Sequence, residues 1–183
     1  MAPKFGTSGL RGLVTELTDG LCAGYTRAFL SAVPHHGRLF LGRDLRASSA
    51  RIAAAVTAAA REAGLSVSDC GEIPTPALAL AAMQAGAPSV MVTGSHIPAD
   101  RNGLKFYSAG GEITKTDEAA ILAAYAGDRA APAAAAEPES SALPAYRARY
   151  VQAFGPSALA GLRVGLWQHS TVARDLLAGL LAD

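Results

Sequence analysis

Apolar residues recur along the first two thirds of the chain at two alternating spacings. In some stretches they lie about four residues apart, the spacing of one helix face, and in others they form the short unbroken runs typical of buried strands. The expected helices are residues 18–33, 48–64, 75–86 and 116–125, and the expected strands are residues 38–42, 65–67, 89–93 and 104–107. Strands that alternate with helices of this length need crossover connections. The pattern therefore predicts the α/β class, with a mixed, largely parallel sheet layered with helices.

Several helix starts carry their own sequence signals. Ser48 or Ser49 is a suitable N-cap for the second helix. Thr75 is followed by Pro76, and proline is favoured at the first helical position. Thr116 is the expected N-cap of the fourth helix. These signals set the predicted boundaries.

The composition changes after residue 127. Residues 128–141 are rich in alanine, proline and glutamate, which is the composition of a semi-rigid linker. Residues 142–183 predict two helices and one strand, at residues 162–166. A single strand with its helices cannot bury both faces of a sheet. We therefore expect a first domain at residues 1–127 and the incomplete start of a second α/β domain, which missing C-terminal domains or a complementing chain would complete.

Charge and cysteine usage exclude several classes of protein. The 183 residues include 16 basic and 15 acidic ones, and this balance argues against a nucleic-acid binder. The sequence has no run of about 18 apolar residues and no signal-peptide pattern, so no membrane partner is expected. Cys22 and Cys70 have no metal or redox spacing, which is typical of a reducing compartment. We expect a cytoplasmic protein.

Two loops concentrate the polar side chains. Residues 4–12 combine three glycines, two hydroxyls and an arginine, which suits a phosphate, although a simple tight turn explains them equally well. Residues 93–105 follow a buried strand, and ligands of open α/β sheets bind just beyond the carboxyl ends of strands. There Ser95 is followed by His96, and Lys105 lies ten residues further on. The second loop is the stronger candidate site.

Two other kinds of catalytic loop do not fit the spacing. A serine-hydrolase elbow needs glycine two residues before and after its serine. Thr93 and Ile97 occupy those positions. A Walker-type phosphate loop needs the pattern G-x-x-x-x-G-K-[ST], which the sequence lacks. A nucleotide-binding α/β domain therefore has little support.

Four stretches of the first domain form an ordered set. They are FGTSGLRG at residues 5–12, LGRDLRASS at 41–49, GEIPTPA at 71–77 and TGSHIPADRNGLK at 93–105. Together they resemble the α-D-phosphohexomutase family, which includes phosphomannomutases and phosphoglucomutases. The resemblance implies an isomerase whose serine passes a phosphoryl group to a hexose monophosphate. The serine then recovers a phosphoryl group from the resulting hexose bisphosphate.

The resemblance also implies roles for individual residues. Ser95 matches the phosphoserine, and Arg11 matches the arginine beside its phosphoryl group. His96 and Lys105 match positions that assist proton transfer, and we prefer Lys105 as the acid/base because a nearby cation would lower its pKa. The expected substrate- or phosphate-binding residues are Thr7, Ser8, Arg11, Asn102 and Lys105. The implied cofactors are Mg²⁺, held through the phosphate on Ser95, and a hexose bisphosphate.

The chain departs from the family pattern in several ways. Gly94 and Ile97 stand where the family often has alanine and asparagine. The aspartate-rich metal loop, the sugar-specificity loop and the C-terminal phosphate-clamping loop have no counterpart, so the chain alone is expected to be inactive. We expect the N-terminal part of a phosphomannomutase-type enzyme that interconverts hexose 1-phosphate and hexose 6-phosphate, with mannose preferred. The alternatives are a phosphoglucomutase and a truncated, non-catalytic module that binds a phosphosugar or a partner.

Overall fold

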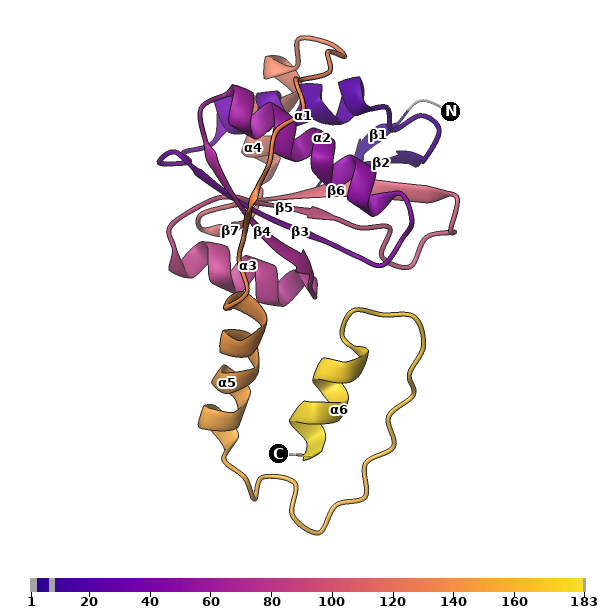
Figure 1. Ribbon diagram of the computed structural model, residues 1–183, viewed down its shortest axis with the longest axis vertical. Helices are drawn as coiled ribbons and strands as arrows, with labels where there is room; N and C mark the ends of the chain where they lie inside the picture. Colours follow the sequence, from indigo (N-terminus) through magenta and orange to yellow (C-terminus); the bar gives the residue numbers. More distant parts are fainter. Residues whose placement is uncertain (1–2, 7–8, 183) are drawn as a thin grey trace.

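The computed structural model describes residues 3–6 and 9–182, which form helices and strands in the order shown in Figure 1. The strands are β1 (Lys4–Gly6), β2 (Gly9–Leu13), β3 (Arg38–Arg43), β4 (Ser66–Glu72), β5 (Ser89–Val92), β6 (Arg101–Ser108), β7 (Gly111–Glu112) and β8 (Glu137–Pro138). The helices are α1 (Asp19–Ala32), α2 (Ser49–Glu62), α3 (Thr75–Gln84), α4 (Lys115–Ala124), α5 (Ala142–Phe154) and α6 (Arg174–Ala182). Within this described part of the chain, no helix has the length and hydropathy of a membrane span.

The strands form one mixed sheet in the order β1-β2-β6-β5-β3-β4-β8, with β7 beside β6. Strands β5, β3, β4 and β8 are parallel to one another, whereas β1, β2, β6 and β7 join by antiparallel pairings. The predicted α/β class and mixed sheet are confirmed. The expectation of a largely parallel sheet holds for one half only. The reason is that a loop, not a crossover helix, joins β5 to β6, so β6 runs back beside β5.

Helices cover both faces of the sheet (Figure 1). On one face, α1, α2 and α4 enclose the main core, and on the other face α3 packs with α5. Strand β5 shows why its residues 90–92 are all apolar: Val90 and Val92 belong to the first core and Met91 to the second. Successive side chains of a strand point to opposite faces, so a strand covered on both sides has no polar position to alternate with.

Two helices begin earlier than the sequence predicts. The N-cap of α3 is Pro74 in place of Thr75, and that of α4 is Thr114 in place of Thr116. Thr114 is favoured because it forms a capping box with Asp117. The threonine hydroxyl accepts the N–H of Asp117 (3.2 Å), and the carboxylate accepts the N–H of Thr114 (2.8 Å).

The segment predicted as a linker is fastened to the first domain. Arg129 donates to Glu62 (2.8 Å), and its carbonyl accepts from Arg27 (2.6 Å). Exposed ion pairs of this kind are worth only about 0.2–1 kcal/mol each. Further along, β8 adds a parallel edge strand to β4, and Ala136 packs against the main core. This segment therefore contributes to the fold.

Residues 142–182 form two helices without a sheet of their own. Helix α5 packs against α3 and buries Ala142. Residues 162–166, predicted as a strand, form none, and Leu162 and Val164 are exposed. A strand needs a neighbour for its N–H and C=O groups, and the described strands all lie in the sheet of the first domain. The strand prediction was wrong for this chain.

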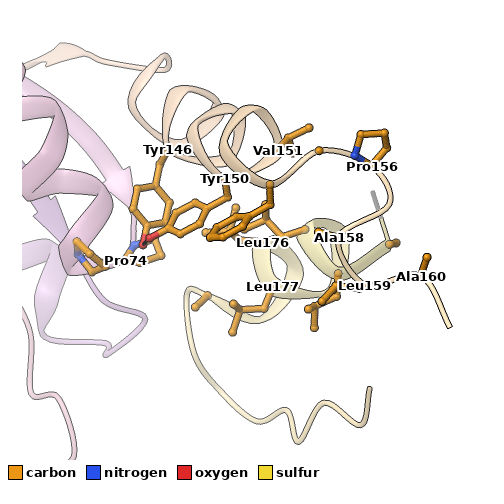
Figure 2. Close-up of a pocket in the computed structure, with 17 residues that line it drawn as sticks. Pro74, Tyr146, Tyr150, Val151, Pro156, Ala158, Leu159, Ala160, Leu176 and Leu177 are labelled. Carbon is orange, nitrogen blue, oxygen red and sulfur yellow. Dashed lines mark hydrogen bonds between the residues drawn. The ribbon is translucent and has the colours of Figure 1, made fainter. Parts of the chain in front are cut away.

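An apolar hollow of about 760 Å³ lies between α5 and α6 (Figure 2). Leucine, alanine and proline side chains make up most of its wall, and none of its lining residues is charged. The hydroxyls of Tyr146 and Tyr150, its most polar groups, are hydrogen-bonded to each other at 2.9 Å. The hollow therefore offers apolar surface and little chemistry.

Candidate active site

Three loops meet where the parallel strands β3, β4 and β5 end. We call this end of the sheet its carboxyl edge. Residues 44–46 follow β3, residues 73–75 follow β4, and residues 93–100 follow β5. Neighbouring parallel strands finish at the same edge of a sheet, so segments far apart in sequence become neighbours in space. Three of the four motifs found in the sequence contribute to this edge.

Ser95 stands at the outer end of this edge with an exposed side chain. Its φ of 49° is in the left-handed region, which few non-glycine residues adopt. The Ser95 N–H donates to the Thr93 hydroxyl (2.9 Å), which in turn donates to Asp44 (3.0 Å). The Oγ of Ser95 lies 3.2 Å from Nδ1 of His96. The loop thus exposes the Ser95 hydroxyl to solvent. The imidazole of His96 lies beside it and can exchange a proton with it.

Strands β2 and β6 place two cationic side chains next to this edge. Their backbones approach closely because glycines face the opposite strand: a Cβ on Gly9 would overlap the carbonyl oxygen of Leu104. Arg11 lies opposite Gly103, and Lys105 lies opposite Gly9. Gly9 and Gly103 therefore allow the close contact of β2 with β6, and Arg11 and Lys105 are near neighbours on these adjacent strands.

A cleft of about 790 Å³ joins these groups. Its lining includes Ser95, His96, Arg11 and Lys105. The predicted catalytic residues are therefore brought together, although they come from β2, β6 and the loop after β5. A smaller recess of about 190 Å³ between β2 and β6 is also lined by Arg11 and Lys105.

The segment before α6 forms another wall of the cleft. Residues 169–173 line it, among them His169, Ser170 and Thr171. No sequence motif marked these residues as part of a site, and their polar character was the only available signal. They were missed because their position depends on how the chain returns toward the first domain after α5.

Lys105 has different surroundings from those expected. Its ammonium group pairs with Glu112 (3.3 Å) and lies 5.4 Å from the centre of the Tyr107 ring. Partial burial lowers the pKa of Lys105, but interactions with Tyr107 and Glu112 raise it by more, so that its pKa is above the ordinary value. The expectation of a lowered pKa was therefore wrong for these surroundings. At neutral pH, Lys105 supplies a positive charge and a proton.

Asn102, another predicted phosphate-binding residue, does not line this cleft. Asn102 is fully buried, and its amide donates to the hydroxyls of Ser48 (2.8 Å) and Ser49 (2.9 Å). Its side chain links β6 to the start of α2, so we do not include Asn102 in the proposed site. Thr7 and Ser8 lie outside the described residues.

The groups available to a metal ion are few in this chain. Among residues 3–6 and 9–182, no cluster of three or more His, Cys, Asp or Glu side chains could hold a metal ion. Asp44, the carboxylate in the cleft lining, is already the acceptor of several hydrogen bonds from its own loops. The described residues do not form a Mg²⁺ site, and we derive no chemical step through the metal.

Asp44 gives the fold an expected dependence on pH. Burial raises the pKa of Asp44, but hydrogen bonds from Ser49, Arg46, Gly94 and Thr93 lower it by more, so that its pKa is below the ordinary value. A carboxyl with a lowered pKa in the folded state stabilises the fold at neutral pH, and this contribution is lost as the pH falls below about 4.

We expect Asp44→Asn to reduce the free energy of unfolding by about 1–3 kcal/mol at pH 7, because buried donors lose an ionised acceptor. The difference from the wild type should be smaller at pH 3 than at pH 7, because the stabilisation provided by the ionised carboxylate declines as the pH falls below about 4. Urea unfolding at both pH values measures this. An equal difference at the two pH values would contradict the assigned role.

The fold and the cleft together define a mixed α/β protein with an exposed serine beside cationic side chains at the carboxyl ends of its parallel strands. A sequence model described as phosphoglucomutase/phosphomannomutase, α/β/α domain I, matches residues 2–131. The chain belongs to this phosphohexomutase family, and it corresponds to the N-terminal portion.

Individual relatives agree with this assignment. A phosphomannomutase of Sinorhizobium fredii is 49% identical over 195 residues, covering 99% of this chain and 41% of the relative. A phosphoglucosamine mutase of Rhodococcus jostii is 37% identical over 177 residues, covering 90% and 40%. A solved phosphoglucomutase/phosphomannomutase family protein of Burkholderia thailandensis matches with a TM-score of 0.67 and 26% identity, covering 81% and 35%. The chain thus spans about two fifths of the length of the curated relatives.

Proposed function

We propose that this chain carries the phosphoryl-transfer serine of a hexose phosphate mutase, with Ser95 as the residue that is phosphorylated. The main observation is the cleft itself, where the exposed hydroxyl of Ser95 and the cations Arg11 and Lys105 share one lining. Preorganised positive groups stabilise the negative charge of a transferring phosphoryl group. Family membership supports the same reading, since the relatives are named as mutases of phosphorylated sugars.

The proposed step exchanges one P–O bond for another. A hydroxyl oxygen of a hexose monophosphate attacks the phosphorus on Ser95, the bond from phosphorus to Oγ breaks, and a hexose bisphosphate forms. The hydroxyl proton of the sugar passes to solvent water in the open cleft, and Oγ of Ser95 gains a proton through His96, whose Nδ1 lies 3.2 Å away. Arg11 and protonated Lys105 balance the charge on the phosphoryl oxygens. In the second half of the proposed cycle, Oγ of Ser95 attacks the other phosphate of the bisphosphate, the bond from that phosphorus to the sugar oxygen breaks, and the isomeric hexose monophosphate is released with a proton on that oxygen.

Mannose phosphate remains our preferred hexose. The 49% identical relative is named phosphomannomutase, and the 37% identical one is named phosphoglucosamine mutase, so the order of similarity favours mannose.

We further propose that Mg²⁺ acts with the phosphate on Ser95 and that its remaining ligands, together with the sugar-specificity groups, come from outside these 183 residues. We also propose that residues 1–127 form a first domain, residues 128–141 a linker and residues 142–183 the incomplete start of a second domain.

Peptide mapping tests the proposal directly. The complete gene product is treated with α-D-glucose 1,6-bisphosphate, digested, and its peptides are weighed for added phosphate. We expect phosphate on Ser95. Phosphate on another residue, or on none, would contradict the proposal and favour the alternative of a non-catalytic phosphosugar-binding module.

A further inference from the structure

The loop that carries Ser95 wraps around the guanidinium group of Arg46. This side chain is only 19% exposed, and its N–H groups point at the backbone of the loop. They donate to the carbonyl oxygens of Ile97 (2.6 Å), Pro98 (2.7 Å), Arg101 (3.0 Å) and Ser95 (3.4 Å). A planar cation with several fixed donors thus occupies the inside of the loop. An ammonium group could not reproduce this pattern, because its donors radiate from one point.

Asp44 holds both the guanidinium and the start of the loop. Its carboxylate lies 3.4 Å from Nε of Arg46 and accepts the N–H of Gly94 (2.9 Å). It also accepts the hydroxyl of Thr93, which in turn accepts the N–H of Ser95. The backbone of Ser95 is therefore fixed on its N–H side through Asp44 and on its carbonyl side through Arg46.

Gly94 leaves the space that the guanidinium needs. A Cβ at this position would overlap Nε and Cζ of Arg46. Gly94 therefore lets the guanidinium lie directly against the backbone of the loop.

We propose that Arg46 is the positioning residue for Ser95. The guanidinium sets the course of the loop and with it the left-handed backbone of Ser95. This inference rests on the proposed function, because the placement of Ser95 matters for activity only if Ser95 carries the phosphoryl group.

Variants of the complete gene product test this role. The measured quantity is the single-turnover rate of Ser95 phosphorylation by α-D-glucose 1,6-bisphosphate, together with the bisphosphate concentration at half-maximal rate. We expect Arg46→Ala and Arg46→Lys each to slow the maximal rate by about 10²-fold, since small misplacements of a reacting group have effects of this size. The half-saturating concentration should change less than threefold.

Arg43→Ala is the matched control, since Arg43 also ends β3 and pairs with a carboxylate, that of Asp69 (3.4 Å). Its rate should stay within threefold of the wild type. The inference is overturned if Arg46→Ala keeps the wild-type rate or if Arg46→Lys restores it. If Arg46→Ala fails to fold, Arg46→Lys still decides, because a wild-type rate there excludes the need for a planar guanidinium. A wild type that takes no phosphate on Ser95 refutes the proposed function itself, a result distinct from all of these.

Discussion

Replacing Ser95 with alanine is expected to abolish mutase turnover in the complete gene product. The substitution removes the oxygen that accepts the phosphoryl group, and losses of a covalent nucleophile commonly reach roughly 10⁴-fold or more in kcat. The KM for the hexose phosphate should change little, since Arg11 and Lys105 still line the cleft. Steady-state kinetics with mannose 1-phosphate and with glucose 1-phosphate measures both quantities and compares the two hexoses.

Ser66→Ala provides the control for this substitution. Ser66 begins β4 at the opposite end of that strand from the loop that joins the cleft, and its hydroxyl contacts only the carbonyl of Gly37 (3.3 Å) among the described hydrogen bonds of its side chain. Turnover of this variant should match the wild type. Substantial turnover in Ser95→Ala would show that the phosphoryl group travels through another residue.

Replacing Phe106 with alanine is expected to have the largest effect on stability. Its ring is fully buried, stacks on Phe5 at 5.9 Å between ring centres, and contacts Phe29 at 4.7 Å. Removing a buried phenyl ring costs about 3–5 kcal/mol, because both the apolar transfer energy and the packing around the new cavity are lost. Urea unfolding of the 183-residue chain, followed by circular dichroism, measures the change.

An exposed leucine of the same domain supplies the comparison. Leu122 on α4 is 45% exposed, so Leu122→Ala should alter the free energy of unfolding by less than about 1 kcal/mol. A loss of under 1 kcal/mol for Phe106→Ala would mean that the aromatic contacts of β6 with β1 and α1 add little to the stability of the fold.

The alternation of helices and strands could be predicted from the sequence, because it depends on the local spacing of apolar residues. The strands ending at Arg43 and Val92 and the serine loop could be predicted, since apolar runs and glycine-containing loops are visible without knowledge of tertiary contacts. The antiparallel return of β6 could not, because nothing in a strand's own composition states the direction of its neighbour. The same holds for the missing strand at residues 162–166, whose formation depends on a partner.

The environment of the site was harder to predict than its members. Ser95 and Lys105 could be named from motifs, but the pairing of Lys105 with Glu112 arises from a turn between β6 and β7 that brings an anion beside the cation. Arg46 and Gly94 lie 48 positions apart, and their contact exists only after β3 and β5 pair in parallel. A motif in the sequence identifies the types of residue in the site. The pKa of Lys105 and the geometry of the Ser95 loop depend instead on neighbours from other strands.

The short strand β8 has a consequence for anyone who divides this protein into pieces. A boundary at residue 131, where the family match ends, would remove β8 and the hydrogen bond from Glu139 to the carbonyl of Asp69 (2.8 Å). The N–H and C=O groups on the outer side of β4 would then be unpaired. Such groups on an exposed edge strand can pair with a strand of another molecule and promote aggregation. A soluble fragment should therefore retain its tail at least through Glu139.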